Sequence, residues 1–135
     1  MAFTQRAKEQ SEKERRDKEE AAIGADQQAI ERTISAFETA FNGMDLKVLQ
    51  ATWTDMPKAT ADIYRNQFGF SKSVAYQLKP IGRPSITGAS AVINCNRALA
   101  LTAKSGEKPP PRPDRVHVAL ERAGANWVIR SITPY

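Results

Sequence analysis

The sequence has one cysteine, Cys95, and one histidine, His117, the two side chains best suited to covalent catalysis. A thiol and an imidazole within hydrogen-bond reach would supply a nucleophile and its base. We expect a hairpin whose loop is centred near residue 109, which sets His117 opposite Leu101 and roughly 20 Å from Cys95 at about 3.4 Å per residue. Cys95 also shares a strand face with Ile93 and Leu99, where a buried, inert thiol is usual. The spacing therefore argues against a Cys–His pair.

Two carboxylates, Asp55 and Asp62, flank Pro57. Asp62 lies two residues before Tyr64, which puts the two side chains on different faces of the expected helix. A metal ion needs several converging ligands, which one histidine and one distant cysteine cannot supply. The glycines are isolated turn residues and form no phosphate-binding loop. The sequence therefore predicts no catalytic residue, no metal site and no cofactor.

Arg97 is the most informative polar residue, because it lies on the apolar face of a predicted strand. A guanidinium among apolar side chains needs a carboxylate partner, an anionic ligand or a path to solvent. Residues 63–106 contain no acidic side chain. Either an acid from another element pairs with Arg97, or the site binds a small carboxylate or similar anion. The candidate partners are Glu31, Glu38, Asp55 and Asp62.

The elements that must position these residues begin with a charged segment. Lysine and arginine number 20 and aspartate and glutamate 15, which gives a net charge of +5. Residues 1–25 hold as many acidic as basic side chains, so the surplus belongs to residues 26–135. Glu-to-base pairs at i,i+4 favour a helix, yet no large apolar residue lies between Lys8 and Glu20. We expect residues 1–25 to be a charged helical spacer or a disordered arm that links to a larger parent or partner protein.

Residues 26–69 have the apolar spacing of successive helices. Asp26 is expected to cap the first, and Asn42-Gly43 to end it with the glycine in the left-handed conformation. Asp45 caps a short second helix that Pro57 limits. The third runs from Thr60 to Gly69. The apolar stripes of the first and third consist of Ile30, Ile34, Phe37 and Phe41, and of Ile63, Tyr64 and Phe68.

Residues 73–135 alternate between apolar and polar side chains, as half-buried strands do. Strands are predicted over 73–79, 91–103, 116–120 and 127–132, with a Gly- and Pro-rich loop over 104–114. Short connections favour an antiparallel meander of the last three. Helices followed by strands give an α+β fold with the N-terminal helices packed on a mainly antiparallel sheet. The outer sheet face carries apolar or small residues, which predicts a two-fold dimer through the sheet: Ala98, Ala100, Ala119 and Val128.

Two stretches carry a family resemblance. The helical stretch has Phe37 and Phe41 before a polar turn, then Asp45, Leu49 and Trp53; the closing hairpin has Trp127 followed by Val128 and Ile129. Over about residues 26–133 the chain resembles the nuclear transport factor 2-like superfamily, also called SnoaL-like or cystatin-like cones, and is most similar to bacterial accessory domains of that type. The resemblance implies a curved sheet wrapped around helices, a conical cavity and often a dimer through the sheet. It implies no reaction, because this fold hosts enzymes and binders alike.

These observations favour a non-enzymatic, cone-shaped accessory domain, residues 26–135, that dimerises or binds a partner or ligand. The alternative is a small-molecule-binding protein or a lyase or isomerase that uses the cavity. Nucleic-acid binding is a third and weaker hypothesis, because the positive charge lacks interleaved aromatic residues. The expected occupant is a small anionic or apolar ligand. Residues expected to converge on the cavity are Trp53, Ile63, Tyr64, Phe68, Tyr76, Ile93, Arg97 and Trp127.

The sequence also bears on location. The sequence contains no run of about 18 apolar residues, so it predicts no membrane span. Its first residues lack the apolar stretch of a secretory signal. One cysteine permits no internal disulfide, which is typical of a reducing compartment. We therefore expect a cytoplasmic protein, or an extracytoplasmic one if the chain is a fragment of a membrane-anchored protein.

Overall fold

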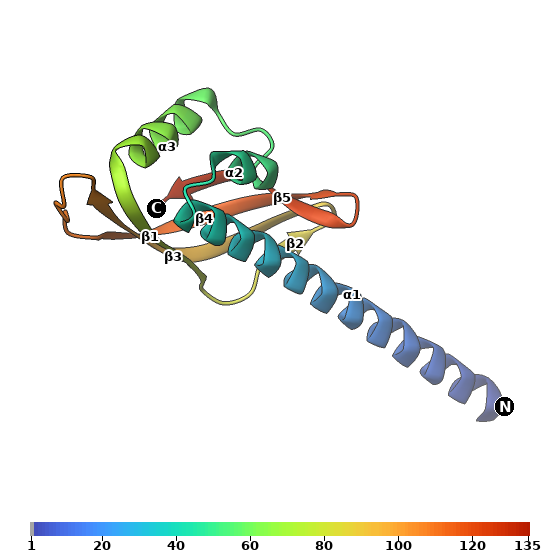
Figure 1. Ribbon diagram of the computed structural model, residues 1–135. Coiled ribbons are helices and arrows are strands. Elements are labelled where there is room, and N and C mark those ends of the chain that lie inside the picture. The colour runs from blue at the N-terminus through green and yellow to red at the C-terminus, as the bar shows by residue number, and fades with distance from the viewer. Residues whose placement is uncertain (1) are drawn as a thin grey trace.

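The computed structural model describes the backbone of residues 2–135 and the side chains of residues 13–18 and 20–135. Its helices precede its strands along the chain (Figure 1). The elements are α1 (Ala2–Asn42), α2 (Leu46–Thr52), α3 (Lys58–Phe70), β1 (Ser71–Pro80), β2 (Ser85–Thr87), β3 (Ser90–Ala103), β4 (Arg112–Ala123) and β5 (Asn126–Pro134).

The strands form one curved, open, antiparallel sheet in the order β1-β3-β4-β5, with the short β2 paired to β3. The predicted meander of the last three strands is confirmed, and so is the α+β class. The sequence did not predict β2, whose three residues are too short to show a period. The C-terminal half of α1 lies across one face of the sheet, and α2 and α3 lie beyond it (Figure 1).

The core fills the space between these helices and the covered face of the sheet. Phe37 and Phe41 from α1 and Trp53, the residue after α2, meet Tyr76 and Trp127 from the strands. The predicted stripe of α1 is buried, with Ile30, Ile34, Phe37 and Phe41 at most 1% exposed. Burial of such aromatic and branched side chains stabilises a fold by about 1.5–3 kcal/mol each.

Some helix boundaries differ from the predicted ones. Asp26 is not a cap, because α1 continues through it, and its carboxylate instead binds Arg122 at 3.0 and 2.7 Å. The left-handed residue after α1 is Met44, with φ +52°, rather than Gly43. Asp45 does cap α2, accepting from the Val48 backbone N–H at 3.2 Å. Helix α3 begins directly after Pro57 and passes through Gly69, because a single glycine lowers helix stability without forbidding a helix.

The β3–β4 hairpin has a different register from the expected one. His117 lies opposite Asn94 rather than Leu101, and Cys95 lies opposite Val116. Strand β4 begins at Arg112, inside the segment predicted to be a loop. Pro113 is tolerated there because β4 pairs with β5 only from Val116 onward, and a strand paired on one side can lack an N–H.

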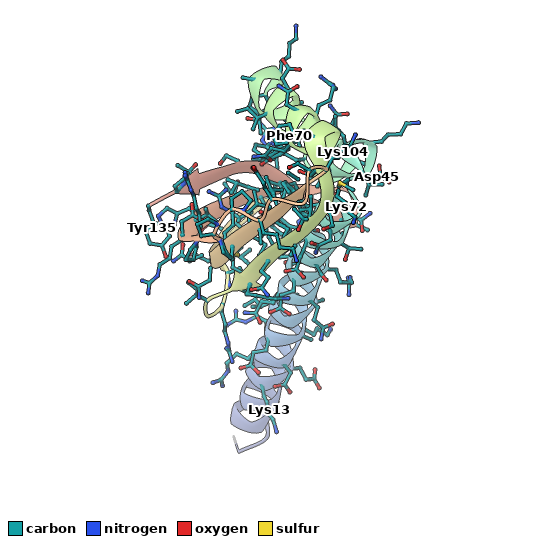
Figure 2. All side chains as sticks on the ribbon, turned by 60° about the vertical axis from the view of Figure 1, so that its left-hand side comes forward. Lys13, Asp45, Phe70, Lys72, Lys104 and Tyr135 are labelled. Carbon is teal, nitrogen blue, oxygen red and sulfur yellow. The ribbon has the colours of Figure 1, made fainter. Side chains whose placement is uncertain are left out.

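The N-terminal part of α1 extends beyond the sheet and away from the other elements (Figure 1). The described side chains from 13 to 22 are exposed, and Ile23 is 50% exposed. Figure 2 shows Lys13 far from the labelled residues of the sheet and of α3. We call residues 2–25 the arm; its role as a spacer stays a prediction.

Candidate functional site

A cavity of about 280 Å³ opens between α3 and the covered face of the sheet. It draws side chains from α1, α3, β1, β3 and β4, so segments distant in sequence meet there. We call it the α3 pocket. Its lining consists of Phe41, Tyr64, Gln67, Tyr76, Arg97, Leu99, Arg112 and Asp114.

Aromatic rings line one side of the α3 pocket. Phe41 from α1 stacks on Tyr76 from β1, with centroids 4.2 Å apart and ring planes 21° apart. Tyr64 meets the edge of Phe41 at 5.0 Å, and Phe68 does so at 5.1 Å. Such stacked and edge-on pairs are favourable beyond the area that they bury. Of these four rings, those of Phe41, Tyr64 and Tyr76 line the pocket and give it an apolar side.

An ion pair supplies the polar side. Arg97 Nε and Nη2 donate to the two carboxylate oxygens of Asp114 at 2.9 and 2.6 Å. The residues lie directly opposite each other on β3 and β4, so the register itself brings them together. Hydrogen bonds to Asp114 raise the pKa of Arg97, although desolvation acts in the other direction. The guanidinium therefore has an internal partner.

That partner is none of the four acids that the sequence suggested. Glu38 instead accepts from the Leu78 backbone N–H at 2.8 Å and from Lys79 Nζ at 3.0 Å. Asp55 binds Arg130, and Asp62 binds Arg65 at 2.7 Å. Glu31 is exposed on α1. Asp114 was missed because it was assigned to a loop.

The two tyrosines of the pocket stay protonated near neutral pH. Burial is the main cause that raises the pKa of Tyr64, with Arg97 acting to lower it. Burial likewise raises the pKa of Tyr76. Both phenols are therefore uncharged, and they lie beside the Arg97–Asp114 pair, whose two charges offset each other.

Gln67 and Arg112 are pocket residues that the sequence did not single out. Gln67 lies three residues after Tyr64 on α3, a helical spacing that could have flagged it. Its Oε1 is buried and has no hydrogen-bond partner among the described groups. Arg112 lies on the same face of β4 as Asp114. The flanking Pro111 and Pro113 interrupt the alternation of apolar and polar residues, so the sequence did not indicate a strand there.

The residues predicted to line the cavity lie in three different environments. Only Tyr64, Tyr76 and Arg97 line the α3 pocket. Trp53, Ile93 and Trp127 are buried in the core, and Phe68 packs against that core. Ile63 was expected to point inward, but it is 54% exposed. The buried face of α3 is set by Ala61 instead, so Ile63 was placed on the wrong side of the helix.

The reactive side chains lie outside the pocket and apart from one another. Cys95 is fully buried, and burial raises the pKa of its thiol to about 11. His117 stacks on Tyr135 at 3.9 Å, and its Nδ1 lies 2.6 Å from Asn94 Oδ1. Because His117 pairs with Asn94 and Cys95 with Val116, the two side chains occupy opposite sheet faces. They are thus separated by the sheet, not by the distance along it that the sequence suggested.

The described residues contain no group of three or more histidine, cysteine or carboxylate side chains that could hold a metal ion. In the same part of the chain, no helix is both long enough and apolar enough to cross a membrane.

No family model and no curated protein sequence matches the chain. Solved structures do. A candidate aromatic ring hydroxylase from Novosphingobium aromaticivorans superposes with a TM-score of 0.71 at 16% identity, over 81% of this chain and 87% of that one. A nuclear transport factor 2-like superfamily protein from Salmonella enterica gives 0.67 at 12% identity, over 85% and 91%.

A candidate calcium/calmodulin-dependent protein kinase type II association domain from Thiobacillus denitrificans gives a TM-score of 0.58 at 18% identity, over 77% of this chain and 91% of that one. Similarity at such low identity is evidence about the fold alone. It agrees with the helices packed on a curved, open sheet, and it confirms the fold that the sequence predicted. The chain has the nuclear transport factor 2-like fold.

Proposed function

We propose that this chain is a non-enzymatic binding domain that holds a small molecule in the α3 pocket. The observation that carries the proposal is the pocket itself: about 280 Å³, with a stacked aromatic wall and convergent polar groups. Ligand sites in proteins combine an apolar lining with a few placed polar groups in this way.

The hydrogen bonds that Asp114 accepts from Arg97 favour ligand binding over catalysis as the role of the pocket. Of the described residues that line the pocket, Asp114 is the only acid, and Arg97 engages both of its oxygens. A general base must be directed at the substrate, whereas both oxygens of Asp114 are directed at Arg97. The alternative, a lyase or isomerase, would have to use Tyr64 or Tyr76 as its acid. The likeness to a candidate hydroxylase keeps that alternative open.

A fragment screen by ligand-observed NMR tests the proposal. Leu99→Trp would fill the pocket from β3, whereas Val92→Trp adds the same ring to the opposite face of that strand, where Val92 is 43% exposed. We expect fragments that bind the parent and the Val92→Trp control but not Leu99→Trp. A screen without any such fragment would contradict the proposal. Turnover of a bound fragment would favour the enzymatic alternative.

We also propose that two copies pair through the outer face of the sheet. Ala98, Ala100, Ala119 and Val128 are only partly exposed there, and Ala75 faces Ala100 across the β1–β3 ladder. A face of small and apolar residues lets two sheets approach closely. The likeness to an association domain is compatible with this second role.

Light scattering at about 100 μM tests the pairing, because mass action favours dimers at high concentration. We expect the mass of two chains for the parent and of one chain for Ala100→Glu, which puts a charge into the proposed contact. Thr60→Glu on α3 is the control for added charge and should remain dimeric. The mass of a single chain for the parent would rule out the proposed dimer.

A further inference from the structure

We infer that the α3 pocket takes a small organic anion, a carboxylate on a flat apolar body, and that Arg112 binds the carboxylate. The inference rests on the proposed binding function and names the ligand class for the same pocket. An anion at Arg97 was one of the two alternatives that the sequence left open; Asp114 takes that place, and the anion is assigned to Arg112 instead.

The charged side chains that line the α3 pocket are the first argument for an anionic ligand. Arg97 and Asp114 neutralise each other through two hydrogen bonds. Tyr64 and Tyr76 are neutral phenols, and Gln67 is a neutral amide. Arg112 contributes the remaining positive charge. The described lining therefore carries one uncompensated cation, which a monovalent anion would balance.

Arg112 is available for that task. Its side chain is exposed, and none of the ion pairs among the described residues includes it. Its strand position opposite Leu99 puts it at the pocket, on the same face as Asp114. An arginine fork presents two parallel N–H donors that match the two oxygens of a carboxylate.

The chain around Arg112 is stiff. Pro111 and Pro113 flank it, and each proline fixes its own φ while also restricting the residue before it. Arg112 is further held by its pairing with β3. A backbone that is already ordered loses little conformational entropy when a ligand binds. The Pro-Arg-Pro sequence and the pairing with β3 therefore preorganise the backbone of Arg112, from which its side chain reaches the pocket.

The rest of the lining selects the body of the ligand. The stacked Phe41 and Tyr76 rings and the Leu99 side chain form an apolar surface next to the cation. The volume of about 280 Å³ lies just below the usual range of ligand pockets, about 300–1,000 Å³, so the ligand must be small. One aromatic ring with a carboxylate matches these requirements.

Isothermal titration with benzoate and with benzyl alcohol, its neutral analogue, tests the inference. The variants are Arg112→Gln and a matched control, Arg115→Gln, which removes the same charge from the opposite face of β4. We expect Arg112→Gln to weaken benzoate binding about tenfold, as the loss of a charge-assisted pair would, and Arg115→Gln to leave it unchanged. Benzyl alcohol should bind more weakly than benzoate to the parent and equally to all three proteins. Thermal melts check that Arg112→Gln stays folded.

Other outcomes separate this inference from the proposed function. Equal binding of benzoate and benzyl alcohol, or benzoate binding that survives Arg112→Gln, would overturn the anion assignment and leave a small-molecule pocket in place. If neither benzoate nor benzyl alcohol binds, but other fragments bind the parent and not Leu99→Trp, the anion assignment alone would be overturned. If the screen finds no fragment whose binding Leu99→Trp abolishes, the proposed function is overturned together with the inference.

Discussion

Asn42 hydrogen-bonds to both backbone groups of Tyr76: its Nδ2 donates to the carbonyl oxygen at 3.0 Å, and its Oδ1 accepts from the N–H at 2.6 Å. Tyr76 lies on β1, the terminal strand of the sheet order. A side chain of α1 thus occupies the place of a missing neighbouring strand. The same residue follows Phe41, the ring that stacks on Tyr76 in the α3 pocket. The end of α1 therefore fixes both the sheet edge and the pocket wall.

Asn42→Ala should lower the free energy of unfolding by about 1–3 kcal/mol, because each of two hydrogen bonds contributes about 0.5–1.5 kcal/mol. Asn66→Ala, an exposed asparagine on α3, is the matched control and should have little effect. Urea unfolding followed by circular dichroism measures both. An Asn42→Ala protein as stable as the control would show that solvent replaces the two bonds without loss.

The Arg97–Asp114 pair should show energetic coupling in a double-mutant cycle of Arg97→Met and Asp114→Leu. Each single change leaves the other charge without its partner, while the double change removes both. Water still reaches the two side chains, which are 24% and 37% exposed. We therefore expect single losses of about 1–2 kcal/mol, between those of exposed and of buried pairs. The double variant should be more stable than the sum of the losses implies; strict additivity would contradict a direct pair.

The sequence predicted the elements of this fold better than their registration. The helical stripe from Ile30 to Phe41 and the alternation in β3 are long, so each shows its period clearly. The β3–β4 register depended instead on where a loop ends, and the prolines from 109 to 113 were assigned to that loop. In fact Arg112 and Pro113 already belong to β4. Asp114 was therefore lost as the partner of Arg97.

The pocket was only partly predictable for a related physical reason. A stripe predicts which side chains turn inward, but it does not tell a filled interior from an open one. Trp53 and Trp127 do turn inward, and they pack into the core instead of lining the pocket. The opening depends on how far α3 stands from the sheet, which no local pattern encodes. Tyr64, Tyr76 and Arg97 were identified because each lies on the inward phase at that end of the sheet.

The contact between Asp26 and Arg122 should make stability depend on acidity. Hydrogen bonds from Arg122 are the main cause that lowers the pKa of Asp26 below its ordinary 3.8. A carboxyl whose folded pKa is depressed contributes stability above its unfolded pKa, and loses it as the pH falls through the folded value. Asp26→Asn should therefore melt lower than the parent at pH 7, and the difference should shrink below pH 3.8. A difference that stays constant toward about pH 2 would contradict this linkage. Asp17→Asn on the exposed arm is the control.

Cys95 should resist thiol reagents while the protein is folded. Its side chain is fully buried, and burial raises the pKa of the thiol to about 11, so little thiolate exists near pH 8. Ellman's reagent should react slowly in buffer and rapidly in guanidinium chloride. In a Cys95→Ala background, Ile63→Cys puts a thiol on the exposed side of α3, away from the proposed sheet contact, and should react at once. Equal rates for the two folded proteins would mean that the β3 region opens readily.

The arm should contribute little to the stability of the domain. Its described side chains are exposed up to Ile23, while the first fully buried residue of α1 is Ile30. Deletion of residues 2–22 should therefore leave the melting temperature nearly unchanged. Deletion of residues 2–30 is the contrasting variant, because it removes Ile30 from the core and Asp26 from Arg122; that protein should be strongly destabilised. A drop of more than about 5 °C for the shorter deletion, on the order of 1 kcal/mol in a domain of this size, would show that the arm packs on the domain or on a second copy.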